Sequence, residues 1–425
     1  MLKEITIQNY KSINSEVTFS MEADCERVSE FPDHIININN NRLLKISSMY
    51  GPNGGGKTNL LTAIQLLKDY IIGSSKPIFF SSNNFSCAFN NDDNIDETVF
   101  FVTEKYEIGY KFILKHNIIK QDRIDFGGNK VSFNISSFDT KYEALIYRSD
   151  SSLDFITLFE RNNKGEIISN VLDDMELKYS KVINENMSAL SYLYNTFVNI
   201  RNVNNIELDV IMNAFQEIFS IYTLDVEEPT INYDVAFNAI RANKNEIIKY
   251  LNNVDIKVND IILDREKKNG SIKFERIVDI NGKKEKRTIP LSYESKGTIK
   301  IFWMFVNLLN ERAKNHIFIC DDMNAFLHPK LSRAIIEIFN SKNNKNNQLI
   351  FNSHDIINMT KDVFRRDEIW FVYRDENYST KLVPLSNIVN YKGEQVRKDA
   401  KYYKQYLEGK YGADPFIKKG FDWNE

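Results

Sequence analysis

The sequence predicts an α/β fold that carries a mixed sheet and a helical insertion lobe. A glycine-rich loop at residues 51–58 lies between an apolar stretch and a helical pattern, which is typical of a strand–loop–helix unit. Helical and apolar strand patterns then alternate over residues 299–373, as they do in a parallel sheet. Helical periodicity dominates the middle of the chain, from about residue 142 to residue 251. We therefore expect one α/β unit that is interrupted by a mainly helical segment.

The first part of the chain, residues 1–138, is expected to hold the N-terminal half of this unit. Its helix begins at Asn59 and should end at the Gly, Ser and Pro residues of 73–77. Runs of alternating or β-branched residues predict the strands of this part. These strands are expected at residues 2–7, 16–21, 44–50, 98–102 and 108–114.

The second and third parts are expected at residues 139–255 and 256–425. The second part shows no sustained heptad repeat, which favours a compact helical lobe over a coiled-coil arm. In the third part, Asn281-Gly282 predicts the turn of a β-hairpin. The strands of the third part are expected at 260–264, 272–280, 288–291, 317–320, 348–352 and 368–373, and its helices at 299–312 and 330–339.

The glycine-rich loop has the spacing G-x-x-x-x-G-K-[ST], which in this context predicts a cradle for phosphate groups. Backbone amides of the loop and the N-terminus of the following helix would face the same anion. Lys57 would reach the β- and γ-phosphates of ATP as a point charge, and Thr58 would offer its hydroxyl to Mg2+. The alternative, a glycine-rich turn that matches by accident, is disfavoured by the flanking strand and helix. The residues expected to bind nucleotide here are Asn53, Gly54, Gly56, Lys57, Thr58 and Asn59.

Two acids follow the apolar run 316–320, which would place them at the carboxyl end of a buried strand. Ligands of α/β proteins bind at that edge of the sheet. Asp321 suits a contact to Mg2+, because a hard cation takes oxygen ligands. Asp322 would be directed at the attacking water. Without the phosphate loop, a strand end that caps a helix would be a competing but less favoured explanation for the pair.

His354 follows the next expected strand, at residues 348–352, and a histidine there can hydrogen-bond the γ-phosphate. A single histidine is more often structural, and its position after a strand favours the nucleotide role here. The segment 291–298 precedes a helix and offers hydroxyl groups, a glycine and a helix N-terminus. Such a segment can bind an anion or can simply cap the helix, and its residues alone leave both alternatives open.

The composition sets only broad limits on function. The chain has 425 residues, of which 42% are hydrophobic and 27% charged, so a large core can form. A net charge of -3 gives no overall attraction to nucleic acid. Cys25, Cys87 and Cys320 are far apart and predict inert thiols without a zinc site. No signal-like or membrane-spanning run is evident, so we expect a cytoplasmic protein without a membrane partner.

Several motifs taken together resemble the P-loop NTPase heads of ABC type. The similarity is to the AAA-type, OLD-like ATPases of bacterial abortive-infection and anti-phage systems, which are relatives of RecF and of the chromosome-maintenance ATPases. It covers both ends of the chain and leaves the helical insertion unmatched. The motifs that carry the resemblance lie at residues 9–12, 51–58, 294–298, 320–329, 352–355, 365–371 and 406–415.

The resemblance implies that two heads close face to face on ATP. The segment with Ser295 and Gly297 in one subunit would contact the γ-phosphate held by the other subunit. His354 would be the switch histidine, and Leu327-His328 would lie on the loop that crosses the dimer interface. The sequence departs from related heads at Asp322, where they have Glu. The Asp side chain is shorter by one methylene, which implies slow hydrolysis.

Two functions remain open at this stage. The first is an ATP-hydrolysing switch that forms a homodimer or higher oligomer and controls a nuclease or toxin, encoded nearby, in anti-phage defence. The alternative is a RecF-like DNA-binding repair ATPase, so nucleic acid stays open as a partner. Its candidate basic patches are residues 283–287, Lys267-Lys268 and Arg365-Arg366, although such charges are more often solvated surface.

Overall fold

A computed structural model describes most of the chain. The described residues are 1–24, 31–73, 80–81, 94–124, 130–149, 152, 154–174, 179–198, 205–224, 233–264, 271–311, 315–389, 395–397 and 400–413. Within these ranges, no helix is both long and apolar enough to cross a membrane. Cys320 is buried as expected, whereas Cys25 and Cys87 lie outside the described residues.

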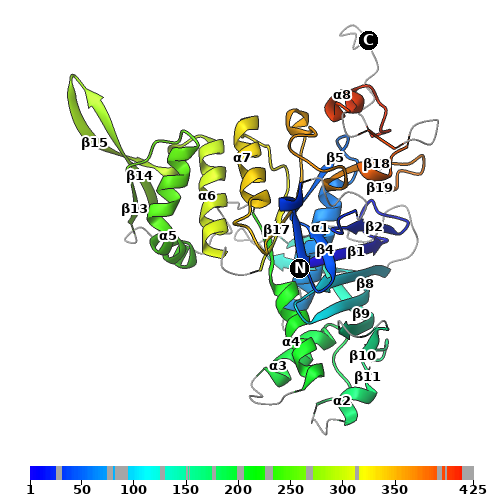
Figure 1. The fold of residues 1–425 in the computed structure, drawn as a ribbon. Coiled ribbons are helices and arrows are strands. Elements are labelled where there is room, and N and C mark those ends of the chain that lie inside the picture. The colour runs from blue at the N-terminus through cyan, green and yellow to red at the C-terminus, as the bar shows by residue number, and fades with distance from the viewer. Residues whose placement is uncertain are drawn as a thin grey trace.

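A six-stranded sheet forms the centre of the molecule (Figure 1). Its first five strands are parallel and its last strand is antiparallel, so the sheet is mixed and the predicted α/β fold is confirmed. In spatial order the strands are β12 (Ile221–Thr223), β16 (Ile317–Cys320), β17 (Gln348–Asn352), β5 (Ile46–Tyr50), β18 (Ile369–Arg374) and β19 (Thr380–Pro384).

Both faces of this sheet are buried. In β16, Ile317 and Ile319 pack into one core, and Phe318 and Cys320 pack into the core on the opposite face. Such alternation follows from the two-residue period of a strand. Near-continuous apolar strands are typical of a parallel sheet that is covered on both sides.

An antiparallel sheet and helix α1 (Lys57–Gly73) cover the first face. Residues of α1 share one core with both sheets, so the helix after the glycine-rich loop lies between them. Residues 74–77, which were expected to end this helix, lie outside the described residues. In spatial order the antiparallel strands are β11 (Ile167–Ile168), β10 (Ile156–Arg161), β9 (Lys130–Ser149), β8 (Tyr106–Ile124), β7 (Asn94–Val102), β1 (Leu2–Gln8) and β2 (Val17–Ser20), with β6 (Phe80–Ser81) beside β9.

Helices cover the second face of the central sheet. They are α5 (Tyr233–Asn253), α6 (Lys296–Glu311) and α7 (Pro329–Asn340). A small sheet of β13 (Asp260–Asp264), β14 (Ser271–Ile280) and β15 (Lys283–Pro290) packs beside α5, and its hairpin projects from the molecule (Figure 1). Asn281 and Gly282 both have positive φ, at 55° and 79°, which confirms the predicted hairpin turn.

The helical pattern that was expected from about residue 142 begins later in the structure. Residues 139–149 belong to strand β9, and β10 and β11 follow it in the antiparallel sheet. Helices begin only later, with α2 (Asn170–Asp174), α3 (Ala189–Phe197) and α4 (Ile206–Phe219). The period-two pattern is obscured because Glu143 and Arg161 are fully buried polar residues in these strands.

A hairpin and a short helix are the remaining strands and α-helix of the described residues. Strands β3 (Ile35–Ile38) and β4 (Asn41–Leu44) form a hairpin directly before β5. Helix α8 (Tyr402–Leu407) packs Tyr406 against Phe371 of the central sheet.

One of the candidate basic patches is also wrong. Arg365 and Arg366 are buried, with 1% and 6% of their surfaces exposed. Arg365 donates to both carboxylate oxygens of Asp367, because a buried guanidinium needs a paired charge. Lys267 and Lys268, the second patch, lie outside the described residues.

Candidate nucleotide site

The glycine-rich loop connects β5 to α1 and passes close to the neighbouring strand. A Cβ atom on Gly51 would lie 1.9 Å from the carbonyl oxygen of Val372, and one on Gly56 would lie 2.1 Å from Thr380 Oγ1. Gly54 and Gly56 also adopt positive φ, at 76° and 110°. Gly56 combines a positive φ with so close an approach that only glycine fits, whereas at Gly54 the positive φ alone favours glycine.

Lys57 lies at the first position of α1 and is 6% exposed. Its ammonium group donates to the carbonyl oxygens of Gly51 and Pro52, at 2.9 and 3.0 Å. Burial lowers the pKa of Lys57, and the charges of Asp322 and Asp321 partly oppose this shift. A desolvated ammonium group that is held only by carbonyl oxygens is well placed to exchange them for phosphate oxygens.

Thr58 and Asp321 meet at the carboxyl end of β16. The hydroxyl of Thr58 lies 3.0 and 3.1 Å from the two carboxylate oxygens of Asp321. The side chain of Asn352, at the end of β17, donates to the same carboxylate. Hydroxyl and carboxylate oxygens are the ligands that Mg2+ prefers, so the residues present fit a magnesium ion. No larger group of His, Cys, Asp and Glu that could hold a metal occurs in the described ranges.

Asp322 and His354 face each other beside the loop. Nε2 of His354 lies 3.7 Å from Asp322 Oδ1, and about half of each side chain is exposed. Asp322 has a φ of 43°, in the left-handed region, and its amide donates to Asn352 Oδ1 at 2.5 Å. Desolvation and the charge of Lys57 lower the pKa of His354 below 6.5, and the two acids oppose this shift. At pH 7 the imidazole is therefore neutral and has one donor and one acceptor nitrogen.

One cavity of about 340 Å³ connects most of these groups. It also contains Arg374, which the sequence reasoning did not identify. Arg374 ends strand β18, the parallel neighbour of β5, and is exposed. Its position directly after the expected strand 368–373 was only a partial signal, because the sequence does not reveal that this strand pairs with β5. The lining residues are Asn53, Gly54, Gly56, Lys57, Thr58, Asn59, Asp322, His354 and Arg374.

Ser295 and Gly297 do not line this cavity. The hydroxyl of Ser295 accepts from the amide of Thr298, at 3.1 Å, and so caps the start of α6. A Cβ atom on Gly297 would lie 2.4 Å from the carbonyl oxygen of Phe326, which explains the glycine at this position. The segment is nevertheless linked to the acids, because Lys300 of α6 donates to the carbonyl oxygen of Asp322 at 2.7 Å.

A parallel sheet whose strand ends carry a phosphate loop, an acid pair and a histidine defines the class of P-loop ATPases. A family model described as "AAA domain, putative AbiEii toxin, Type IV TA system" matches residues 46–358. This match covers more than half of the chain, and the chain therefore belongs to that family of P-loop ATPases. The expected link to abortive-infection ATPases is confirmed at this level.

The chain is also similar to solved structures. The SMC head domain from Thermotoga maritima is similar at 15% identity with a TM-score of 0.37, over 90% of this chain and 98% of that chain. The SmcHead bound to the C-winged helix domain of ScpA is similar at 12% identity with a TM-score of 0.37, over 90% of this chain and 96% of that chain. No curated protein matches the sequence.

Proposed function

We propose that the protein is an ATP-hydrolysing switch that dimerises on ATP and controls a partner effector in anti-phage defence. One observation carries the proposal. Lys57, Thr58, Asp322 and His354 line one cavity, whereas Ser295 lies outside it on an exposed segment. The residues of one copy can hold the phosphates but do not enclose them. This favours a second copy of the chain, which would close the site.

The residues divide into three roles in this proposal. Lys57 and the loop amides hold the phosphates, and Thr58 with Asp321 holds Mg2+, which when bound neutralises charge on the phosphate oxygens. Asp322 accepts a hydrogen bond from the attacking water. Neutral His354 donates a hydrogen bond to the γ-phosphate and so distinguishes ATP from ADP.

The surface around Ser295 supports a second copy as the partner. Tyr293 is 81% exposed and Phe326 is 67% exposed, and both lie next to the segment in sequence or space. Phe326 is held in the left-handed region, with a φ of 64°, and Lys296 lies 5.0 Å from its ring centre. Exposed aromatic side chains are enriched where protein surfaces associate.

Replacing Asp322 should separate hydrolysis from dimerisation. Asp322→Glu is expected to raise kcat by about tenfold, because one more methylene corrects a carboxylate set back from its target by about 1 Å. Asp322→Asn should lower kcat by about a hundredfold, because the amide is a poor proton acceptor. Steady-state phosphate release measures both variants.

Sedimentation with each nucleotide supplies the second half of this test. Asp322→Asn should be a dimer with ATP and a monomer with ADP. Asp355→Asn is the matched control, because Asp355 caps a short helical turn and does not line the cavity. Equal kcat in Asp322→Asn and the wild type would contradict the role of Asp322.

Arg374 should contribute to ATP binding. We expect Arg374→Ala to raise the Kd for ATP by about tenfold, since a charge-assisted hydrogen bond to phosphate is lost. Arg374→Lys should recover part of the affinity, because the charge remains and the planar fork does not. Titration with a fluorescent ATP analogue measures the Kd. Arg333→Ala, on α7 and paired with Glu337, is the control, and an equal Kd in both alanine variants would refute the contact.

The link to defence is tested in cells. Bacteria that carry this gene with its neighbouring reading frame should resist phage, and Lys57→Ala should abolish the resistance. Deleting the neighbouring frame should also abolish it, because the chain acts through an effector. Resistance that persists in the Lys57→Ala cells would contradict an ATP-controlled switch.

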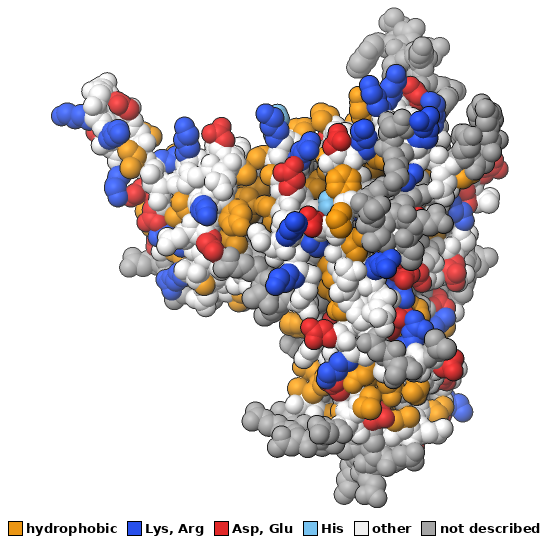
Figure 2. Space-filling model, viewed as in Figure 1, with side chains coloured by type: hydrophobic (Ala, Val, Ile, Leu, Met, Phe, Trp, Pro, Cys, Tyr) orange, Lys and Arg blue, Asp and Glu red, His pale blue; other side chains and the backbone are white. Residues whose placement is uncertain are grey.

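A RecF-like DNA-binding ATPase is the second candidate, and the β14–β15 hairpin is the observation that favours it. Figure 2 shows Lys and Arg side chains along this projecting arm. Lys286 and Arg287 pair with Glu275 and Glu285, whereas Lys283 and Lys284 form no ion pair within the described part of the chain. Salt-dependent DNA affinity that is lost in Lys283→Glu/Lys284→Glu would support this function. An unchanged affinity in that variant would count against it.

A further inference from the structure

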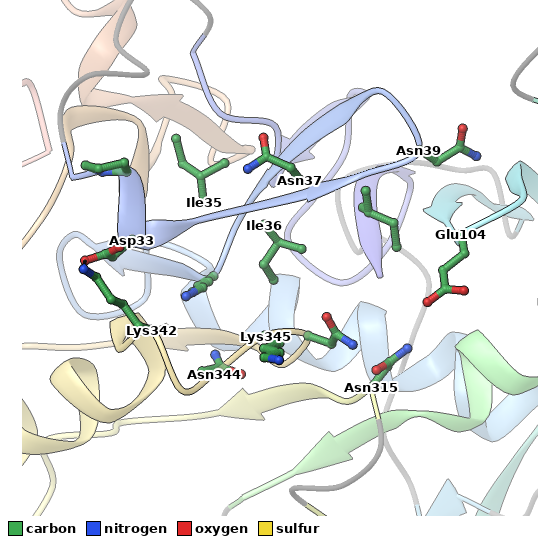
Figure 3. Close-up of a pocket in the computed structure, with 14 residues that line it drawn as sticks. Asp33, Ile35, Ile36, Asn37, Asn39, Glu104, Asn315, Lys342, Asn344 and Lys345 are labelled. Carbon is green, nitrogen blue, oxygen red and sulfur yellow. Dashed lines mark ion pairs between the residues drawn. The ribbon is translucent and has the colours of Figure 1, made fainter.

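A second cavity, of about 570 Å³, lies beside the β3–β4 hairpin (Figure 3). Strand β3 forms one wall, and residues 342–346, the loop between α7 and β17, form the other. Asp33 and Lys342 lie at one end, and Glu104 lies at the other end. We call this cavity the β3 groove.

One edge of β3 is unpaired along the β3 groove. The two-residue turn at Asn39-Asn40 makes Ile38 and Ile36 the residues that exchange hydrogen bonds with β4. The amide of Lys45 donates to the carbonyl of His34 at 2.9 Å. This bond continues the pattern, because His34 lies two residues before Ile36. The remaining groups therefore point away from β4. They are the main-chain groups of Ile35 and Asn37. The amide of Ile35 donates to the carbonyl of Pro32, and the other three groups have no partner among the described residues.

The opposite wall is held in place by its own contacts. Asn344 donates to the carbonyl oxygens of Phe339 and Asn347, at 2.7 and 2.8 Å. Lys45 donates to the carbonyl oxygen of Ser341 at 2.9 Å, which ties the loop to the strand that follows β4. The β3 groove is therefore formed before anything binds in it, which reduces the entropic cost of binding.

The charges of the β3 groove favour an acidic group at its middle. Lys342 is already near Asp33, with 3.8 Å between the charged atoms. Lys345 is exposed at the middle of the loop wall and has no ion pair among the described residues. An extended segment bound along β3 would bring one of its side chains opposite Lys345, where a carboxylate is complementary.

The β3 groove lies at the opposite end of the central sheet from the nucleotide site. Lys45 precedes β5, which leads into the phosphate loop, and the loop wall precedes β17, which leads to His354. Asn315 precedes β16, which leads to Asp321. A segment in the β3 groove would leave the nucleotide cavity open, and it would touch the starts of three strands that carry the nucleotide residues at their ends.

We propose that the β3 groove binds an extended segment of a partner protein as an added strand, with an acidic residue opposite Lys345. The main-chain bonds to Ile35 and Asn37 supply affinity, and the pairing with Lys345 supplies selectivity. A segment of about five residues spans the edge of β3. Strand β3 has four residues, and a paired strand rises by the same distance, about 3.3 Å per residue. This goes beyond the ATP switch and does not require nucleotide.

The test uses the full chain and a fluorescent pentapeptide, acetyl-Thr-Val-Asp-Val-Thr-amide, in an anisotropy titration without nucleotide. Lys345→Glu should weaken binding by about tenfold or more, and a peptide with Lys in place of Asp should bind Lys345→Glu better than wild type. Asn37→Pro should weaken binding similarly, because it removes the free amide of the edge strand. Asn37→Ala, which keeps that amide, should bind within about twofold of wild type.

Each outcome decides the proposal. Peptide binding that is absent in wild type, equal in Lys345→Glu, or equal for the Asp and Lys peptides would overturn it. Lys345 is exposed, so Lys345→Glu tests the proposal even where Asn37→Pro fails to fold. Lys57→Ala should bind the peptide as wild type does, which separates this result from any failure of the ATP switch.

Discussion

Lys57→Ala should lower the kcat for ATP hydrolysis by about two to three orders of magnitude, the usual cost of removing one preorganised charge from a transition state. The ammonium group lies in the nucleotide cavity, where only carbonyl oxygens of the loop hold it. Water screens it little, because the side chain is 6% exposed. Phosphate release at saturating ATP measures the effect.

The loss in Lys57→Ala should not come from unfolding. Burial lowers the pKa of Lys57, so the folded protein carries this charge at a cost that the alanine removes. The Tm should therefore stay close to that of the wild type. Lys361→Ala, at an exposed position away from the cavity, is the control and should keep full turnover. A Lys57→Ala variant that hydrolyses ATP as fast as this control would show that the site is not catalytic.

Glu143→Ala should cause the largest loss of stability, about 3–5 kcal/mol in the free energy of unfolding, because a buried guanidinium is left without its carboxylate. Glu143 and Arg161 are both fully buried, and their charged atoms lie 3.7 Å apart. Glu143 also accepts hydrogen bonds from four groups at 2.6–2.9 Å. They are the hydroxyls of Tyr110 and Ser188 and the amides of Ala189 and Leu190 at the start of α3.

Urea unfolding measures the loss in Glu143→Ala. Glu160→Ala is the matched control, because Glu160 is in the neighbouring strand β10 and is exposed. The control should change the unfolding free energy by less than about 0.5 kcal/mol. Tyr70 of α1 also donates to Glu143, at 3.3 Å, so the variant should loosen the helix that carries the phosphate loop. Equal midpoints in the two variants would show that the buried network contributes no stability.

The sequence predicted those side chains of the candidate nucleotide site whose positions follow from the strand or helix next to them in the chain. Lys57 and Thr58 follow a strand and begin a helix, and Asp321 and His354 each follow an apolar run. The carboxyl ends of parallel strands lie at the same edge of a sheet. The predicted positions of the strands are therefore enough to expect these side chains close together. In the structure Lys57, Thr58 and His354 line one cavity, and Asp321 lies within hydrogen-bond distance of Thr58.

Other features depended on sheet order, which the sequence does not reveal. Arg374 reaches the cavity because β18 pairs with β5, although the two strands are far apart in the chain. Strand β12 has only three residues, too few for a period-two pattern, and it joins the central sheet from within the expected insertion. The division into residues 1–138, 139–255 and 256–425 is not tested by these observations and stays a prediction. Cytoplasmic location also stays a prediction.

The most direct test of the account is to mix two inactive variants. Lys57→Ala lacks the phosphate grip, and Ser295→Arg blocks the segment offered to the other copy. A mixed dimer would hold one intact site, so an equal mixture should recover about a quarter of wild-type hydrolysis if subunits exchange freely in a two-fold dimer. A mixture that stays as inactive as its components, although both variants are folded and exchange subunits, would contradict a site shared between two copies.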